Sequence, residues 1–193
     1  MTMIEVLSEI YTNEGVHIRE LSRRLKLSMP AVKNQIDKLL KEGLITKKRE
    51  GRNLKLYINR KNRNLTPYLY QIEATRLKRL PKSVGDSIFD LISSLENKPL
   101  MAIVFGSYAK GTFTKTSDLD IMLVFNKPTE EIEKKAKLVG SRHSINLEPV
   151  YLSWDSFSKK FFDEKDAFMK ELKGNRIIVT GIEYWRELEN EKA

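Results

Sequence analysis

The chain contains no cysteine, and this absence excludes two classes of feature. Disulfide bonds and thiolate metal centres both need cysteine, so neither can be present. A chain without thiols fits the reducing cytoplasm, where we expect this protein. Long apolar runs are missing as well, since the longest is far shorter than the roughly 20 residues that a membrane-spanning helix requires. The first ten residues lack a basic start and a long apolar core, so we expect no secretory signal.

Acidic residues are scarce in the first part of the chain. Residues 1–80 hold 18 Lys and Arg against 8 Asp and Glu, whereas residues 81–193 hold 17 against 18. The net charge of +9 therefore arises entirely from the first part. Such asymmetry is typical of a nucleic-acid-binding module joined to a near-neutral domain. A solvated lysine-rich surface is the alternative that composition alone leaves open.

The N-terminal region has the apolar spacing of three helices, followed by a hairpin. Helices are predicted over residues 2–12, 17–25 and 28–42, with Ser28 as N-cap of the third and Pro30 in its first turn. Two strands, 44–49 and 54–58, flank a turn with a basic tip. Three helices and a basic hairpin make a winged helix-turn-helix.

Residues 18–59 resemble the winged-helix transcription regulators of bacteria and archaea, with ELSRRLKLSMPAVKNQIDKLLKEGLI as the matching core. The resemblance implies that the third helix enters the DNA major groove and that the wing touches the backbone or minor groove. The implied base contacts are Met29, Lys33 and Asn34, and the implied phosphate contacts are Lys47, Lys48, Arg49 and Arg52. A winged helix used only for protein contact or for forming a homodimer remains the alternative.

The stretch from Leu100 to Phe125 carries the second set of signals. Six apolar residues, 100–105, predict a buried strand, a polar loop is predicted over 106–117, and residues 118–125 predict a second strand. Side chains alternate along a strand, so Asp118 and Asp120 emerge on the same side. Two carboxylates so close repel each other unless a cation offsets them, and oxygen ligands of this kind suit Mg²⁺.

The predicted loop offers groups that a triphosphate needs. Gly106 permits a sharp exit from the strand, Ser107 offers a hydroxyl and an amide, and Lys110 is a mobile cation. The chain has no GxGxxG, and Thr112-Phe113 stands where a Walker A loop requires Lys followed by Ser or Thr. The alternative is a polar hairpin with exposed acids at a strand end.

Gly106-Ser107 followed by Ser117-Asp118-Leu119-Asp120 resembles the signature of the DNA polymerase β-type nucleotidyltransferases, and GSYAKG resembles the loop of the minimal members of that superfamily. The resemblance implies a third carboxylate on a neighbouring strand, for which Glu148 in INLEPVYL is the best match. The sequence departs from the commonest pattern there, because the residue is Glu rather than Asp and Pro149 implies a sheet edge or a bulge. Glu148 as an exposed edge-strand acid is the alternative.

Function follows from these resemblances. Asp118, Asp120 and Glu148 are the implied catalytic and metal-binding residues, with two Mg²⁺ ions, and the implied nucleotide-binding residues are Gly106, Ser107, Lys110 and Ser117. The implied reaction moves a nucleoside monophosphate from an NTP to a hydroxyl. The alternative is a winged-helix regulator or antitoxin-like protein whose transferase domain senses a nucleotide or binds a protein, such as a small helical toxin.

The predicted fold class is α+β in two domains. We expect a winged helix-turn-helix over residues 1–62, a linker helix over 63–81, and a nucleotidyltransferase fold with a mixed sheet flanked by helices over 82–193. The expected partners are duplex DNA, an NTP and a protein acceptor or toxin.

Overall fold

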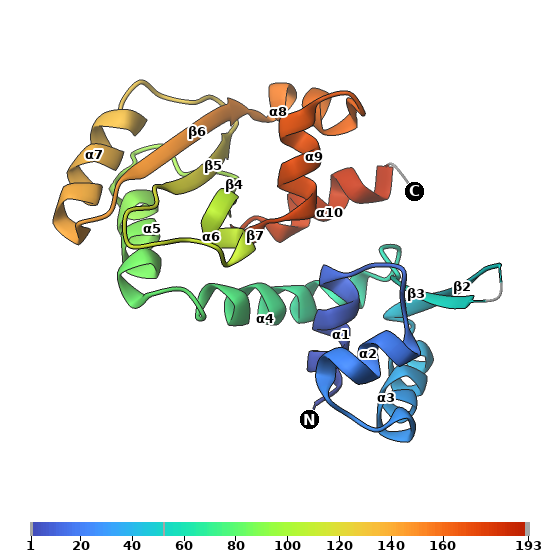
Figure 1. Cartoon of the computed structure of the whole chain (residues 1–193). Helices are drawn as coiled ribbons and strands as arrows, with labels where there is room; N and C mark the ends of the chain where they lie inside the picture. Colours follow the sequence, from blue (N-terminus) through green and yellow to red (C-terminus); the bar gives the residue numbers. More distant parts are fainter. Residues whose placement is uncertain (1, 52, 192–193) are drawn as a thin grey trace. The chain divides into compact units, whose positions relative to one another are not determined.

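The computed structural model describes residues 2–51 and 53–191, which form two compact units. Unit 1 extends to Ile72 and unit 2 begins at Glu73, so the division falls inside helix α4 (Thr66–Leu77). This position lies within the segment that the sequence predicts as a linker helix. Each unit has its own sheet and its own helices (Figure 1).

Unit 1 packs three helices against a small antiparallel sheet (Figure 1). The strand order in this sheet is β1-β3-β2. The helices are α1 (Met3–Thr12), α2 (Ile18–Leu25) and α3 (Met29–Lys41), the strands are β1 (Val16–His17), β2 (Ile45–Glu50) and β3 (Asn53–Ile58), and the 3₁₀ turn η1 (Arg63–Leu65) precedes α4. The predicted winged helix-turn-helix is confirmed. Strand β1 was not predicted, because two residues are too few to show an alternating pattern.

Local chemistry explains where α3 begins. The Ser28 hydroxyl accepts a hydrogen bond from the Ala31 amide at 3.4 Å, which satisfies one of the amides that the first turn leaves without a partner. Pro30 lies in that turn, where its missing N–H costs nothing. The inner face of α3 then buries Val32, Ile36 and Leu39 completely. Its outer face is left to solvent.

Unit 2 is built on a four-stranded mixed sheet with the order β6-β5-β4-β7. Strand β4 pairs antiparallel with β5 and β7, whereas β5 and β6 run parallel. The strands are β4 (Met101–Val104), β5 (Leu119–Phe125), β6 (Leu147–Ser153) and β7 (Ile177–Thr180), and the helices are α5 (Lys82–Ser94), α6 (Gly106–Lys110), α7 (Ile132–His143), α8 (Trp154–Phe162), α9 (Ala167–Gly174) and α10 (Ile182–Glu191). The predicted mixed sheet flanked by helices is confirmed.

Helices cover both faces of this sheet (Figure 1). One face packs against α5 and α7 in a core that includes Ile88, Leu91, Ile121, Leu123 and Val139. On the other side α8 contacts β5 and β6, and α10 contacts β4. The two-residue alternation therefore sends Ile121 and Leu123 toward α5 and α7, and sends the intervening positions to the opposite face.

One predicted detail differs from the structure. The sequence predicts a loop throughout residues 106–117, but Gly106–Lys110 form the short helix α6. This turn is too short to show helical periodicity in the sequence. Helix α4 covers Thr66–Leu77 within the segment 63–81 that the sequence predicts as a linker helix, and α5 begins at Lys82. The prediction that Pro149 marks a sheet edge is confirmed, since β6 is an edge strand.

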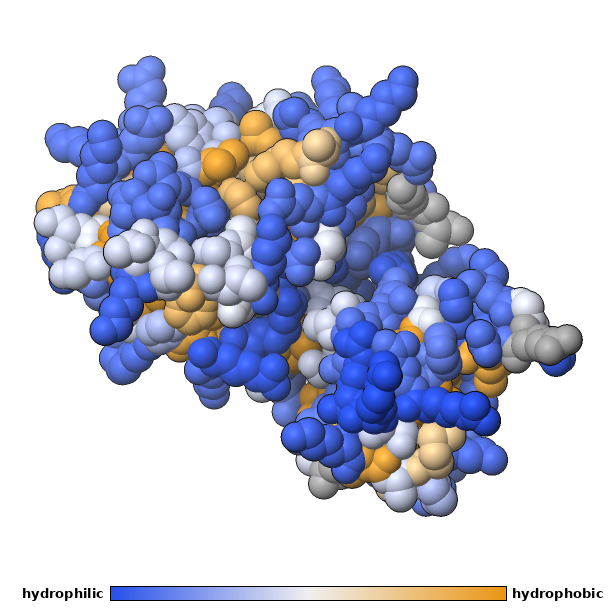
Figure 2. Space-filling model, in the orientation of Figure 1, coloured by the Kyte–Doolittle hydropathy of each residue, from blue (hydrophilic) through white to orange (hydrophobic). Residues whose placement is uncertain are grey.

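The surface is predominantly polar. Hydrophilic residues cover most of the visible face of each unit (Figure 2). The large apolar side chains that remain exposed lie on seven different elements: Met29, Leu54, Tyr70, Phe89, Leu138, Val150 and Phe162. None of the helices in the described ranges has the length and apolar character needed to cross a lipid bilayer.

A close approach at Gly140 connects α7 to β6 and yields a stability prediction. A Cβ atom at this glycine would lie 2.5 Å from the backbone oxygen of Ile145. Gly140→Ala should therefore destabilise unit 2 by about 1–3 kcal/mol, because backbone atoms must move apart. Gly85→Ala is the matched control, because Gly85 lies in α5 with open space at its Cβ position.

The control substitution should stabilise unit 2 by about 0.5–1 kcal/mol through helix propensity. Denaturant unfolding followed by tryptophan fluorescence measures both changes, since Trp154 and Trp185 are the only tryptophans and both lie in unit 2. Equal midpoints for the two variants would contradict the close packing of α7 against the start of β6.

Candidate functional site

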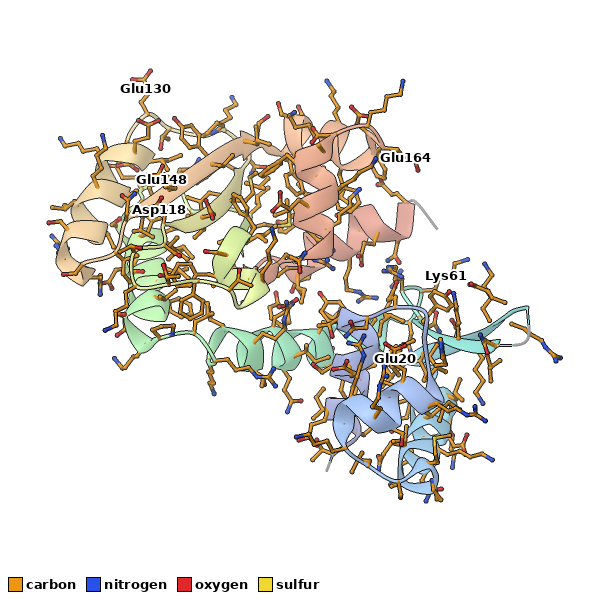
Figure 3. All side chains as sticks on the ribbon, viewed as in Figure 1. Glu20, Lys61, Asp118, Glu130, Glu148 and Glu164 are labelled. Atoms are coloured by element: carbon orange, nitrogen blue, oxygen red, sulfur yellow. The ribbon has the colours of Figure 1, made fainter. Side chains whose placement is uncertain are left out.

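Three carboxylates gather where the paired strands β5 and β6 begin. Asp120 and Glu148 are register partners in the parallel pairing, so their side chains project from the same face of the sheet. Asp118 comes directly before β5 and is exposed. Figure 3 shows Asp118 and Glu148 next to each other. The structure thus brings together the three acids that the sequence singled out. Asp118, Asp120 and Glu148 are called the acidic group below.

Asn146 joins two of these acids. Its side-chain Nδ2 donates to Asp118 Oδ1 and to Glu148 Oε1, each at 2.8 Å. Its backbone oxygen accepts a hydrogen bond from the Leu119 amide at 2.8 Å. Asn146 is not among the predicted site residues, although it lies two residues before Glu148 and so emerges on the same side of the chain. That alternation was the signal that could have found it.

Gly106 lies directly against Asp120. A Cβ atom at Gly106 would be 2.0 Å from Asp120 Oδ2, and the glycine adopts φ +63°, a conformation that other residues rarely take. The preceding Phe105 amide donates to the backbone oxygen of Asp120 at 3.1 Å. The start of α6 therefore lies next to Asp120, and the half-buried Ser107 is the next residue of this helix after Gly106.

Two of the predicted nucleotide-binding residues have partners of their own. Lys110 Nζ forms an ion pair with Glu171 Oε1 of α9 at 2.6 Å, a contact that the sequence did not predict. The Ser117 hydroxyl accepts a hydrogen bond from the Thr114 amide at 2.8 Å and closes the turn before Asp118. In this structure both side chains make contacts within the protein rather than projecting freely into solvent.

The acidic group is electrostatically strained at Asp120. Burial raises the pKa of the Asp120 carboxyl above its ordinary value. The negative charges of Asp118, Glu148 and Glu171 raise the pKa further. Each of these influences disfavours the ionised form, and a bound cation would offset all of them.

The donor chemistry of this group fits a divalent metal ion. Carboxylate oxygens are the ligands that Mg²⁺ prefers. Within residues 2–51 and 53–191, no three His, Asp or Glu side chains are already arranged around one point to hold an ion. The fit therefore rests on the carboxylates Asp118, Asp120 and Glu148 and on the unfavourable negative charge at Asp120.

The predicted DNA-contact residues of α3 share its outer face. Met29, Lys33 and Asn34 are all exposed, opposite the buried Val32 and Ile36. An exposed polar and basic face on the third helix is what a major-groove contact requires.

The predicted contacts of the wing divide between two faces. Lys47 and Arg49 oppose Leu56 and Leu54 across the hairpin, whereas Lys48 opposes Lys55. Because side chains alternate along a strand, Lys48 projects from the face opposite to Lys47 and Arg49. Arg52, the fourth predicted wing contact, lies outside the described residues.

The Lys48 face of the wing also contains an acid. Glu50 Oε2 pairs with Lys55 Nζ at 2.6 Å, and the Tyr57 hydroxyl donates to Glu50 Oε1 at 2.5 Å. The hydrogen bond from Lys55 lowers the pKa of the Glu50 carboxyl, and the charge of Lys48 lowers it further. Positive charge on this face is therefore partly offset. The residues of β2 and β3 on the other face include Lys47 and Arg49 but no acid.

The two units together define a chain with a winged helix followed by a nucleotidyltransferase-type domain. The family model of the nucleotidyltransferase domain matches residues 87–181, and the MarR family model matches residues 1–55. A candidate protein adenylyltransferase from Methanocaldococcus jannaschii is 30% identical over 91 residues, which span 47% of this chain and 88% of that protein. The chain therefore belongs to the nucleotidyltransferase family, with a MarR-like N-terminal region.

Other similarities are more restricted. A CCA-adding enzyme from Picrophilus torridus is 43% identical over 70 residues, which cover 35% of this chain but only 16% of that enzyme. A solved toxin-antitoxin structure with AMP-PNP is 19% identical, with a TM-score of 0.42 over 55% of this chain and 81% of that one. A MarR repressor structure from Listeria monocytogenes has a TM-score of 0.30 and 19% identity over 49% of this chain and 69% of that one. TM-scores this low do not establish a shared fold.

The raised pKa of Asp120 predicts how stability depends on pH. A carboxyl whose pKa is higher in the folded than in the unfolded chain makes folding less favourable as the pH rises from the unfolded-state pKa through the folded-state pKa. Asp120→Asn removes the charge, so in the presence of a chelator it should raise the melting temperature at pH 7. The gain should shrink toward pH about 4, near the unfolded pKa, where wild-type Asp120 becomes neutral.

Glu130→Gln is the control, since it removes one charge from an exposed side chain that points away from the acidic group (Figure 3). Thermal unfolding at several pH values measures the effect. A melting temperature for Asp120→Asn at or below that of wild type at pH 7 would show that the acidic group carries no electrostatic strain.

Proposed function

We propose that the protein is a Mg²⁺-dependent nucleotidyltransferase that moves a nucleoside monophosphate from an NTP to a hydroxyl group. The observation that carries this proposal is the register pairing of Asp120 with Glu148, with Asp118 beside them and Gly106 against Asp120. Membership of the nucleotidyltransferase family supports it. These residues supply a concentrated negative charge next to the first residues of α6.

The three carboxylates would hold the metal ions. Divalent ions in such a site stabilise negative charge on the attacking and leaving oxygens of a phosphoryl transfer. In the reaction a bond forms between the acceptor oxygen and the α-phosphorus, and the bond from that phosphorus to the α,β-bridging oxygen breaks, so that pyrophosphate leaves. Glu148, which is exposed, either completes the metal site or takes the proton of the acceptor hydroxyl.

The triphosphate would lie along the start of α6. Gly106 and Ser107 would supply backbone amides and a hydroxyl, and Ser117 lies at the end of the same connection. Lys110 would offer positive charge to the β- and γ-phosphates. Because Lys110 pairs with Glu171, nucleotide binding would exchange one anionic partner of this lysine for another.

We infer that the donor is ATP and that the acceptor is a protein hydroxyl. The support is the relative from Methanocaldococcus jannaschii, whose name is that of a candidate protein adenylyltransferase and of which this chain covers 88%. The CCA-adding enzyme supports the same chemistry, but this chain covers too little of it to point to its acceptor. Transfer to an RNA end is the other outcome that the experiment below would reveal.

Substitution of the acids tests the catalytic assignment. Incubating the full-length protein with each labelled NTP in cell extract should transfer label from ATP in a Mg²⁺-dependent way. Asp120→Asn should abolish transfer, because it removes charge from the proposed metal site while keeping the side-chain shape. Glu148→Gln should lower turnover more than tenfold, which corresponds to about 1.4 kcal/mol of barrier.

Glu130→Gln again serves as the control and should retain wild-type turnover. Nucleotide binding without turnover in the wild type would favour the nucleotide-sensing or antitoxin-like alternative. Wild-type turnover in Asp120→Asn would end the metal-site assignment, and a loss below tenfold in Glu148→Gln would leave Glu148 as an edge-strand acid.

We further propose that unit 1 binds duplex DNA. The match to the MarR family, the exposed outer face of α3 and the excess of positive charge in residues 1–80 support this. Met29, Lys33 and Asn34 would contact bases, whereas Lys47, Arg49 and Lys48 would contact phosphates, with Arg52 as a further candidate. On the wing, we expect Lys47 and Arg49 to contribute more than Lys48, because the negative charge of Glu50 lies on the same face as Lys48.

The division of the wing into two faces can be tested by salt dependence. The double substitution Lys47→Ala/Arg49→Ala should weaken binding to all sequences. It should also reduce the slope of log affinity against log salt by about 0.9 for each phosphate that the variant no longer neutralises. Lys48→Ala should have a smaller effect. Gel-shift titrations of the full-length protein at two salt concentrations measure both quantities.

The double substitution Lys134→Ala/Lys137→Ala on α7 removes the same charge from exposed positions of unit 2 and is the control. An equal loss in that control would mean that only net charge matters. Absence of DNA binding by wild type at low salt would leave the winged helix as a protein-contact module.

A further inference from the structure

Asn146 is held in place by backbone contacts at the junction of α7 and β6. The Ile145 amide donates to the Gly140 oxygen at 3.0 Å, and Gly140 leaves no space for a side chain against this turn. On the other side, the Leu119 amide donates to the Asn146 oxygen at the point where the parallel pairing of β5 and β6 begins. The backbone of Asn146 is therefore tied to α7 and to β5.

The side chain of Asn146 uses both of its donor hydrogens. A primary amide has two N–H groups, and here one bond goes to Asp118 Oδ1 and the other to Glu148 Oε1, both at 2.8 Å. The amide is uncharged, so it brings two like-charged groups to a fixed separation without adding a charge of its own. Each carboxylate keeps its second oxygen for another ligand.

We propose that Asn146 is a positioning residue of the acidic group. Its side chain fixes the orientation of Asp118 and Glu148 for a divalent cation. The inference rests on the proposed function, since it assigns to Asn146 the task of orienting proposed metal ligands. Groups that orient metal ligands through hydrogen bonds typically affect metal affinity by about 10- to 100-fold. Asn146 acts through the two carboxylates and does not itself bind the ion.

A different role for Asn146 would give opposite results. If its amide occupied the place of the cation, removing the amide would strengthen metal binding. If its carbonyl oxygen were a direct ligand, a carboxylate at the same position would replace it well. The substitutions Asn146→Ala and Asn146→Asp therefore separate positioning from both of these roles.

The test measures Mn²⁺ binding to the full-length protein by calorimetry. Asn146→Ala should weaken Mn²⁺ binding by about tenfold or more, because neither carboxylate is then oriented. Asn97→Ala is the matched control: the Asn97 amide donates to the Lys127 oxygen at 2.7 Å, away from the acids, and its loss should leave Mn²⁺ affinity unchanged. Unfolding followed by tryptophan fluorescence checks that each variant is folded.

A second measurement uses turnover at saturating metal. Asn146→Asp should lose turnover at least as fully as Asn146→Ala, because aspartate cannot donate to Asp118 or Glu148 and repels both. Retained turnover in Asn146→Asp would identify a direct ligand, and tighter Mn²⁺ binding by Asn146→Ala would identify a competitor of the cation. Either result overturns the proposal.

The Mn²⁺ measurement does not depend on transfer activity, so the two proposals can fail separately. If wild type transfers no nucleotide but Mn²⁺ affinity falls in Asn146→Ala, the positioning role stands and the enzymatic function fails. If Mn²⁺ affinity is unchanged in Asn146→Ala but lost in Asp120→Asn, the metal site stands and the positioning role fails. A wild type that binds no Mn²⁺ overturns both.

Discussion

The site of unit 2 depends on the parallel pairing of β5 with β6. This pairing places Glu148 beside Asp120 and lets Asn146 reach Asp118, although the two segments are separated by the whole of α7. Parallel strands cannot be joined by a tight turn, so the helix is the element that makes the arrangement possible. The close approach at Gly140 then sets the turn from which β6 starts.

The same pairing carries an electrostatic cost. The fold collects acids around Asp120, whose burial already disfavours charge. Two features make the arrangement tolerable: the neutral amide of Asn146 links two of the carboxylates, and Gly106 gives the Asp120 carboxylate the space that a side chain would take. A cluster of like charges destabilises the folded chain, so its presence indicates a functional site rather than a role in packing.

The separation of charge between the two units is consistent with two separate tasks. Unit 1 contains the excess of basic residues, whereas unit 2 contains the acidic group and is close to neutral over its length. A concentration of carboxylates would repel the phosphates of a nucleic acid, so a DNA-binding surface is more effective on a unit of its own. Each unit has its own sheet and buried residues, which allows each surface to be shaped independently.

The sequence by itself determined most of the local elements and singled out Asp118 and Asp120, whereas Glu148 was selected through the resemblance to the nucleotidyltransferases. Ser28 and Pro30 mark the start of α3, the apolar run at 100–105 marks β4, and the two-residue alternation places Asp118 and Asp120 on one side. Only the tertiary structure decided what lies next to them. The bridging role of Asn146, the pairing of Lys110 with Glu171 and the contact of Gly106 with Asp120 join segments that are distant in the chain. Local periodicity indicates which face of a strand or helix is buried, but the choice of partner depends on how the whole core packs, and no short stretch of sequence contains that information.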